Sequence, residues 1–139
     1  MSLTFFTDRD LGQQFPNHLH AAGLTVVRHS DLFAPDAPDE EWLARVGDEQ
    51  WLAVTHDRRI RYKPNELAAV ERHRVTLLVV VGAAPFRVLA ENFVTTLSRI
   101  EAFVTDRPRP FIAKVYRAQP ADLARDPRAP GRVELWYPR

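Results

Sequence analysis

The stretch from Val75 to Val81 limits most strongly what this chain can fold into. From Thr76 onwards it contains only threonine, leucine and valine. A strand with one exposed face alternates apolar and polar residues, whereas a continuous apolar run is typical of a strand covered on both faces of a parallel sheet. We therefore expect a buried central strand here, and with it an α/β fold.

Shorter strands and amphipathic helices alternate along the rest of the chain. Further strands are expected at 3–7, 24–27, 51–54 and 111–116, the last of these at the sheet edge, while 133–137 either pairs or only packs. Helices are expected at 10–22, 39–49, 66–74 and 85–104 from apolar residues at helical spacing, with a loop at 33–38. This order predicts a three-layer α/β/α sandwich with a mostly parallel central sheet.

The chain of 139 residues has the length of one domain, but its charges are unevenly placed. Residues 1–104 carry 11 basic and 14 acidic side chains, whereas residues 105–139 carry 8 basic and 4 acidic ones. The last segment also holds 6 of the 11 prolines. We expect a single domain over 1–139, with 105–139 as a basic C-terminal extension packed on or beside it.

Several classes of chemistry are excluded by what the sequence lacks. It has no cysteine, and therefore no disulfide framework, thiolate nucleophile or cysteine zinc site. No serine stands in a Gly-x-Ser-x-Gly setting, and no glycine-rich turn follows a strand. No apolar run approaches the roughly 20 residues that span a bilayer, and no basic segment opens the chain, so we expect a cytoplasmic protein.

Three aspartates fall where a parallel sheet gathers its ligands. Asp8 ends the first strand, Asp57 follows the third, and Asp39 opens the helix that leads into the third. Ligands of open parallel sheets bind at the carboxyl ends of the strands. Three carboxylates there would repel one another unless a divalent cation neutralised them, and oxygen ligands favour Mg²⁺ or Mn²⁺. The sequence predicts a metal site at this edge and, through metal-bound water, phosphodiester hydrolysis.

The same aspartates also fit a simpler role, because an aspartate after a strand often caps a helix or turn. Asp39 in particular stands where a helix N-cap is expected. The joint placement of the three favours a site, and Asp10, Glu40 and Glu66 lie near the same expected edge. Glu40 and Glu66 are candidates for a further catalytic carboxylate, and Asp10 for a secondary role.

A basic loop follows Asp57 directly. Its cations, with Arg9 near the first strand, are candidates for binding an RNA phosphate; they are Arg58, Arg59, Arg61 and Lys63. Tyr62 offers a ring on which a base can stack. The alternative is an ordinary solvated loop.

Other polar and aromatic residues receive less specific predictions. Thr55 and His56 are secondary candidates, although strand alternation would direct His56 away from its neighbours. The other histidines, His18, His20, His29 and His73, lack zinc-like spacing and are expected at the surface. Trp42 and Trp51 are expected in the core, while Trp136 and Tyr137 are left open between packing, RNA contact and a homodimer interface.

Two segments resemble a known family. Asp39-Glu40-Glu41-Trp42-Leu43, followed by Trp51-Leu52-Ala53-Val54-Thr55-His56-Asp57, resembles the PIN-domain pattern of an aspartate opening a helix, then a strand, then Thr-x-Asp. Phe5 to Gly12 and Thr55 to Glu66 are similar to the short PIN-like proteins grouped with VapC-type toxins. The resemblance covers about residues 3–104.

The resemblance implies a fold, an activity and partners. It implies an α/β/α fold and a Mg²⁺- or Mn²⁺-dependent endoribonuclease, the toxin of a bacterial toxin-antitoxin pair, with RNA as substrate and a cognate antitoxin as partner. Asp8, Asp39 and Asp57 match the family's acidic positions. Typical VapC toxins carry another glutamate on a helical pair for which this chain is too short, so the fourth carboxylate is open between Glu40 and Glu66. The alternatives are a non-catalytic PIN-like module that binds RNA or protein, and a nuclease acting on DNA.

Overall fold

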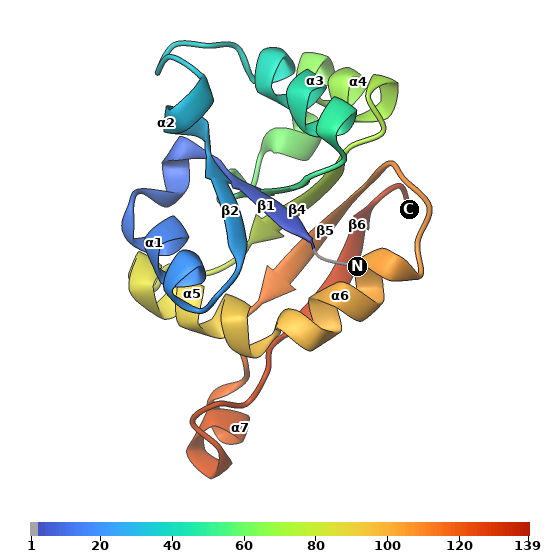
Figure 1. The fold of residues 1–139 in the computed structure, drawn as a ribbon. Helices are drawn as coiled ribbons and strands as arrows, with labels where there is room; N and C mark the ends of the chain where they lie inside the picture. Colours follow the sequence, from blue (N-terminus) through green and yellow to red (C-terminus); the bar gives the residue numbers. More distant parts are fainter. Residues whose placement is uncertain (1–2) are drawn as a thin grey trace.

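A six-stranded sheet organises residues 3–139, which are the residues that the computed structural model describes (Figure 1). The strands, in chain order, are β1 (Thr4–Thr7), β2 (Thr25–Arg28), β3 (Leu52–Thr55), β4 (Thr76–Val80), β5 (Phe111–Tyr116) and β6 (Arg132–Tyr137). They lie in the order β2-β1-β3-β4-β5-β6. Every neighbouring pair is parallel except β5 and β6, which are antiparallel. The predicted mostly parallel sheet is confirmed.

Helices cover both faces of the sheet, as the α/β/α prediction requires (Figure 1). They are α1 (Gln14–Ala21), α2 (His29–Leu32), α3 (Asp39–Glu49), α4 (Pro64–Arg72), α5 (Phe86–Thr95), α6 (Leu97–Thr105) and α7 (Pro120–Arg125), with 3-10 turns η1 (Arg9–Leu11) and η2 (Ile60–Tyr62). Helices α1, α5 and α6 pack on one face, and α3 and α4 pack on the other. None of the helices in residues 3–139 is long and apolar enough to cross a bilayer.

The two cores begin from adjacent residues of β1, because successive strand side chains point to opposite faces. Phe5 packs against Phe93 of α5, with ring centroids 5.5 Å apart. Phe6 instead stacks on Trp42 of α3 at 5.4 Å. Trp42 is fully buried and Trp51 is half-buried against the same cluster, so the predicted core roles are confirmed for Trp42 and largely for Trp51.

Two predictions for the C-terminal half are wrong. The strand at 111–116 is interior, because β6 pairs with it and takes the edge. The helix expected at 85–104 is two helices, separated at Thr96. The buried hydroxyl of Thr96 donates to the carbonyl of Asn92 (2.6 Å) and accepts from the backbone N–H of Gly131 (2.9 Å). These two hydrogen bonds connect the break between α5 and α6 to the C-terminal segment.

Near the N-terminus, the expected helix at 10–22 begins later than its apolar spacing indicates. Residues 9–11 form the separate turn η1, which ends at Gly12 with a φ of +67°. This left-handed backbone strongly favours glycine and interrupts the helix before α1 starts. The short helices α2 and α7 were not predicted.

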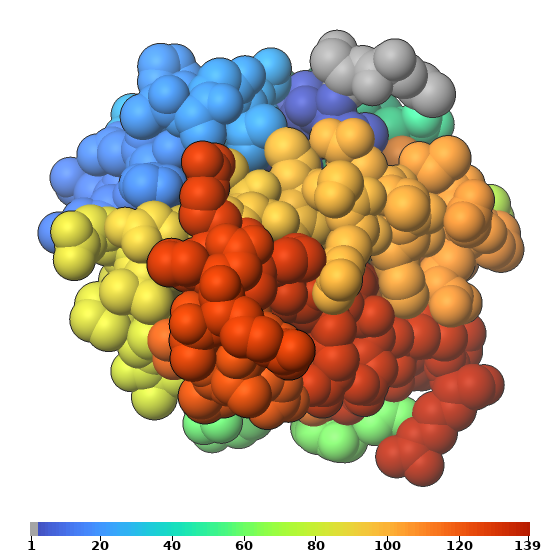
Figure 2. All heavy atoms as spheres, turned by 90° about the horizontal axis from the view of Figure 1, so that it is seen from below, coloured from blue at the N-terminus to red at the C-terminus, as the bar shows by residue number. Residues whose placement is uncertain are grey.

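Residues 117–131 form an excursion between β5 and β6 that carries α7 away from the sheet (Figure 1). Viewed from below, the C-terminal segment lies on the surface beside α5 and α6 (Figure 2). Asn92 of α5 fastens its start, since its side-chain amide donates to the carbonyl of Tyr116 (3.1 Å) and accepts from the N–H of Ala118 (3.2 Å). Residues 105–139 thus contribute two strands to the sheet itself, with the excursion between them.

Candidate active site

The candidate site lies where β1 and β3 end side by side. The two strands are parallel, with Thr7 opposite Val54. The backbone N–H of Asp8 extends this pairing by donating to the carbonyl of Val54 (3.0 Å). Asp8 and Thr55 are consequently neighbours at the carboxyl edge of the sheet, as the sequence predicted for Asp8.

Asp8 and Asp10 converge on one hydroxyl group. Oδ2 of Asp8 lies 3.0 Å from Oγ1 of Thr55, and Oδ2 of Asp10 lies 3.1 Å from the same oxygen. One hydroxyl has one proton, so it can donate to only one of the two carboxylates at a time. The turn η1 causes this convergence by folding Asp10 back beside Asp8.

His56 completes the support of Asp10 through its backbone. Its N–H donates to both carboxylate oxygens of Asp10, at 3.2 and 3.1 Å. Its ring is held by the carbonyl of Val80, 2.8 Å from Nδ1, and packs edge-on against Phe86. The strand ends at Thr55, so the predicted alternation stops there and His56 serves the site through its main chain.

Both carboxylates of this pair are harder to ionise than an exposed aspartate. Burial raises the pKa of Asp8, and the negative charge of Asp39 adds to the effect. For Asp10, desolvation of the carboxylate together with the charge of Asp8 raises the pKa from 3.8 to about 6. Such pKa shifts are common at functional sites, because these sites often hold charged groups close together and away from water.

Asp39 lies near this pair but does not cap its helix, so the capping prediction is wrong. Pro38 occupies the N-cap position, and Asp39 is the first residue of α3. Its Oδ1 accepts a hydrogen bond from the indole N–H of Trp42 (2.9 Å). Its charge contributes to the raised pKa of Asp8. Asp39 therefore acts on the site electrostatically.

Asp57 has partners of its own. Its Oδ2 lies 2.6 Å from Nζ of Lys63, and its Oδ1 accepts from the backbone N–H of Arg59 (2.9 Å). Partial burial acts to raise the pKa of Asp57, but these two bonds outweigh it and the pKa is lowered. Hydrogen bonding to Asp57 also raises the pKa of Lys63. Asp57 is thus stable as an ion within the fold.

The structure therefore keeps the predicted trio near one edge, since the N–H of Asp57 donates to the Thr55 hydroxyl (3.2 Å), but it does not join the three carboxylates into one ligand group. Within residues 3–139, no three histidine or carboxylate side chains lie close enough together to form a metal-binding group. The donor chemistry of Asp8 and Asp10 still fits a divalent cation, because two partly buried carboxylates share one hydroxyl donor and hard cations prefer carboxylate oxygen. Asp10, predicted for a secondary role, stands at the centre of the site.

Arg9 and His29 form the wall beside Asp8. Nε of Arg9 donates to Nδ1 of His29 (2.9 Å), and its terminal nitrogen donates to the carbonyl of Phe33 (2.8 Å). His29 is only 4% exposed, so its predicted surface position is wrong. Burial lowers the pKa of His29, in keeping with a neutral ring that accepts from Arg9. A hollow of about 220 Å³ opens between this wall and Asp8.

The remaining predicted residues lie further from the pair. Glu40 is exposed and lines a hollow against α4, while Glu66 is half-buried and its charge helps to raise the pKa of Lys63. Arg58 and Arg59 are exposed on the loop after Asp57. Arg61 points toward aromatic rings near β6 and not toward the carboxylates.

Sequence reasoning missed the role of His29 and underrated Asp10. A signal for His29 was present, since it follows β2, the neighbour of β1, and strand ends in a parallel sheet share one edge. The signal for Asp10 is weaker. It depends on the turn that ends at Gly12, whose positive φ cannot be read from apolar periodicity.

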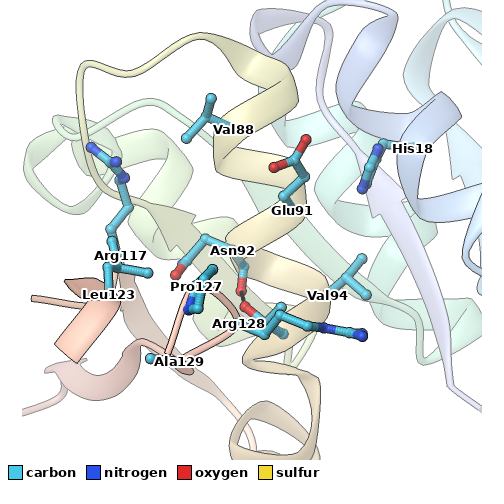
Figure 3. A pocket seen from close by; sticks show the side chains of 11 residues that line it. His18, Val88, Glu91, Asn92, Val94, Arg117, Leu123, Pro127, Arg128 and Ala129 are labelled. Atoms are coloured by element: carbon cyan, nitrogen blue, oxygen red, sulfur yellow. Dashed lines mark hydrogen bonds between the residues drawn. The ribbon is translucent and has the colours of Figure 1, made fainter. Parts of the chain in front are cut away.

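A second hollow, of about 280 Å³, lies between α5 and the excursion (Figure 3). Arg117 and Arg128 come from the excursion side, and His18 and Glu91 from α1 and α5 (Figure 3). The carboxylate pair does not line it. Its best-defined polar group, Asn92, is engaged in fastening the excursion.

The fold and site define a class of protein: an α/β/α domain with acidic side chains collected at the carboxyl edge of a mostly parallel sheet. The family model for the PIN-like domain matches residues 3–82, which is more than half of the chain, and the chain belongs to this family. The family includes nucleases, and its members are often metal-dependent. The comparison with curated proteins gave no match, and neither did the comparison with solved structures.

Proposed function

We propose that this chain is a Mg²⁺- or Mn²⁺-dependent endoribonuclease that serves as the toxin of a bacterial toxin-antitoxin pair. The observation that carries the nuclease proposal is the convergence of Asp8 and Asp10 on the Thr55 hydroxyl, with both pKa values raised. All four aspartates of the region lie inside the segment matched by the PIN-like family. The toxin role, with a cognate antitoxin as partner, rests on the resemblance of the N-terminal motif and of residues 55–66 to VapC-type proteins.

Asp8 and Asp10 would hold the divalent cation, with the charge of Asp39 nearby. A cation at such a site polarises a phosphodiester and lowers the pKa of bound water. Thr55 and the backbone of His56 hold the two carboxylates in place, so that they need little rearrangement on binding.

The surrounding cations are suited to the substrate. Arg58 and Arg59 are exposed after β3 and can reach phosphates from solvent. Lys63 is paired with Asp57, which fixes the position of the ammonium group beside the site and offsets its charge. Arg9 is fixed by His29 and contributes charge beside Asp8.

The experiment is cleavage of RNA by the purified chain with Mn²⁺. Asp8→Asn and Asp10→Asn should each abolish cutting, because each removes a carboxylate of the pair. Asp48→Asn is the matched control, since Asp48 is an exposed aspartate of α3 outside the site. Cutting by Asp8→Asn at the wild-type rate would overturn the proposal, and a preference for DNA over RNA would change its substrate.

A second function is favoured by one observation, the engagement of Asp57 by Lys63. Because Lys63 engages Asp57, Asp57 does not join Asp8 and Asp10 as a third carboxylate. This arrangement favours a non-catalytic PIN-like module that binds RNA or a protein. Titration calorimetry separates the two: absence of Mn²⁺ and Mg²⁺ binding at millimolar metal supports the module.

A further inference from the structure

We propose that one face of the β5–β6 ribbon, together with η2, binds unpaired bases of single-stranded RNA. We call this surface the β5–β6 face; it consists of Arg61, Tyr62, Lys114, Tyr116, Arg132, Glu134 and Trp136. The choice of RNA as the nucleic acid rests on the function proposed above. Most of the surface lies outside the segment matched by the PIN-like family, which ends at residue 82.

Strand register places these side chains on one face. Lys114 pairs with Glu134, and Tyr116 pairs with Arg132, across the antiparallel ladder. Directly opposed residues share a face of the sheet. The intervening residues Val133 and Leu135 pack into the core on the opposite side. Arg132 and Glu134 are exposed, so this end of the sheet remains open to solvent on the β5–β6 face.

Aromatic rings and cations alternate over this face. Nζ of Lys114 lies 4.3 Å from the ring centre of Trp136, and the guanidinium of Arg132 lies 4.0 Å from that of Tyr116. The face carries three cations, and its one carboxylate, Glu134, is paired with Arg132. Positive charge beside aromatic surface is the combination by which proteins bind single-stranded nucleic acid.

Tyr62 is the most accessible ring of the group. It is 66% exposed, although it is a large aromatic side chain. It meets Trp136 edge to face at 5.7 Å, and the guanidinium of Arg61 lies 5.3 Å from its ring centre. Arg61 also lies against Trp136 and Tyr137, and it donates to the hydroxyl of Tyr62 (3.2 Å). These contacts hold the ring in position while most of its surface stays open to solvent.

Arg61 has one polar atom that these contacts leave without a hydrogen bond. Its Nε is buried and, in the part of the chain that the structure describes, has no hydrogen-bond partner. An unpaired buried donor costs stability, so the group calls for an explanation, and a bound ligand is one. The position also suits a substrate, because η2 joins the site loop directly and Tyr116 ends β5 at the same sheet edge as the carboxylate pair.

The test measures binding of a labelled, unstructured oligouridylate of about 12 nucleotides, a length within the range of single-strand sites. Fluorescence anisotropy is recorded in EDTA, so that no metal-dependent cutting occurs. Tyr62→Leu should weaken binding by about 5- to 100-fold, the range for loss of one stacked base. Tyr62→Phe retains the ring and should stay within about twofold of wild type. Leu32→Ala is the control, since Leu32 is an exposed apolar residue on the remote helix α2.

Two further measurements test the chemistry of binding. Lys114→Met should reduce the slope of log affinity against log salt by about 0.7, as expected for one cation on a single strand. Single-stranded RNA should compete for the protein, whereas a duplex of the same length should compete poorly, because its bases are already stacked.

Equal affinity of Tyr62→Leu and wild type would overturn the proposal. Equal loss in Tyr62→Phe and Tyr62→Leu would also overturn it, because the hydroxyl and not stacking would then be responsible. Absence of RNA binding by wild type would overturn it as well. The nuclease proposal can fail independently of this one, because Asp8→Asn should bind RNA normally in EDTA whatever the outcome of the cleavage assay.

Discussion

Replacing Asp10 with asparagine should make the protein more stable at neutral pH, although it removes a site residue. The folded chain raises the pKa of Asp10 from 3.8 to about 6. Between pH 3.8 and about pH 6, the Asp10 carboxyl is deprotonated in the unfolded chain but still protonated in the folded chain. Stability therefore falls as the pH rises from about 4 to 6, and the loss persists above pH 6. Asparagine is neutral at every pH and escapes this loss.

The size of the effect follows from the same shift. A change from 3.8 to about 6 corresponds to a ceiling of about 3 kcal/mol, at 1.36 kcal/mol for each pH unit. Asp10 as a whole residue is exposed, so solvent screens part of this energy, and we expect about 1–2 kcal/mol. Asparagine keeps an acceptor for the backbone N–H of His56 and a donor for the hydroxyl oxygen of Thr55. In a domain of this length the gain amounts to about 3–8 °C in Tm.

The assay is urea unfolding of wild type and Asp10→Asn at pH 7 and near pH 4, in the presence of EDTA. The variant should be more stable at pH 7, and the difference should vanish near pH 4, where Asp10 is largely protonated in the folded chain. Asp36→Asn, at an exposed loop position, should change little at either pH. A difference of the same size at both pH values, or a variant less stable at pH 7, would refute the electrostatic reasoning.

Three further substitutions test the structure more simply. Asp57→Asn should leave Mn²⁺ affinity by calorimetry unchanged and strengthen RNA binding at low salt, because it removes a negative charge and frees the Lys63 ammonium for phosphate; lost Mn²⁺ binding would instead support the trio predicted from sequence. Gly47→Ala should lower the free energy of unfolding by more than about 2 kcal/mol, since a Cβ there would overlap the carbonyl oxygen of His73. Phe93→Ala should cost about 3–5 kcal/mol in urea unfolding, because its ring is fully buried.

The sheet could be predicted because a strand that is buried on both faces consists almost entirely of apolar residues. The continuous apolar run ending at Val81 contains the central strand β4, and β3 is likewise buried along its whole length. The antiparallel edge was harder to predict. Strand β6 alternates core residues such as Val133 with polar residues such as Glu134, and the prolines around it favoured irregular structure. The sequence therefore placed the edge one strand too early.

The site was only partly predictable, because strand ends can be inferred but loop geometry cannot. Asp8 was placed correctly, since its position depends only on where β1 stops. Asp10 reaches the same hydroxyl only through the turn η1. Lys63 binds Asp57, six residues earlier in the chain, and the sequence of the loop between them has no periodic pattern from which this contact could be predicted. The sequence shows which acidic residues lie at one edge of the sheet, and the loop conformations determine which carboxylates come into contact.

The difference between the pair and Asp57 is energetic. Lys63 and the N–H of Arg59 already stabilise the charge of Asp57, so the folded chain gains little from adding a cation there. Asp8 and Asp10 share one hydroxyl, and the pKa of each is raised, so ionising either carboxylate in the folded chain costs stability. A ligand that supplies positive charge recovers that cost on binding. The pair, unlike Asp57, should therefore gain stability from a bound cation, and the proposed chemistry should begin there.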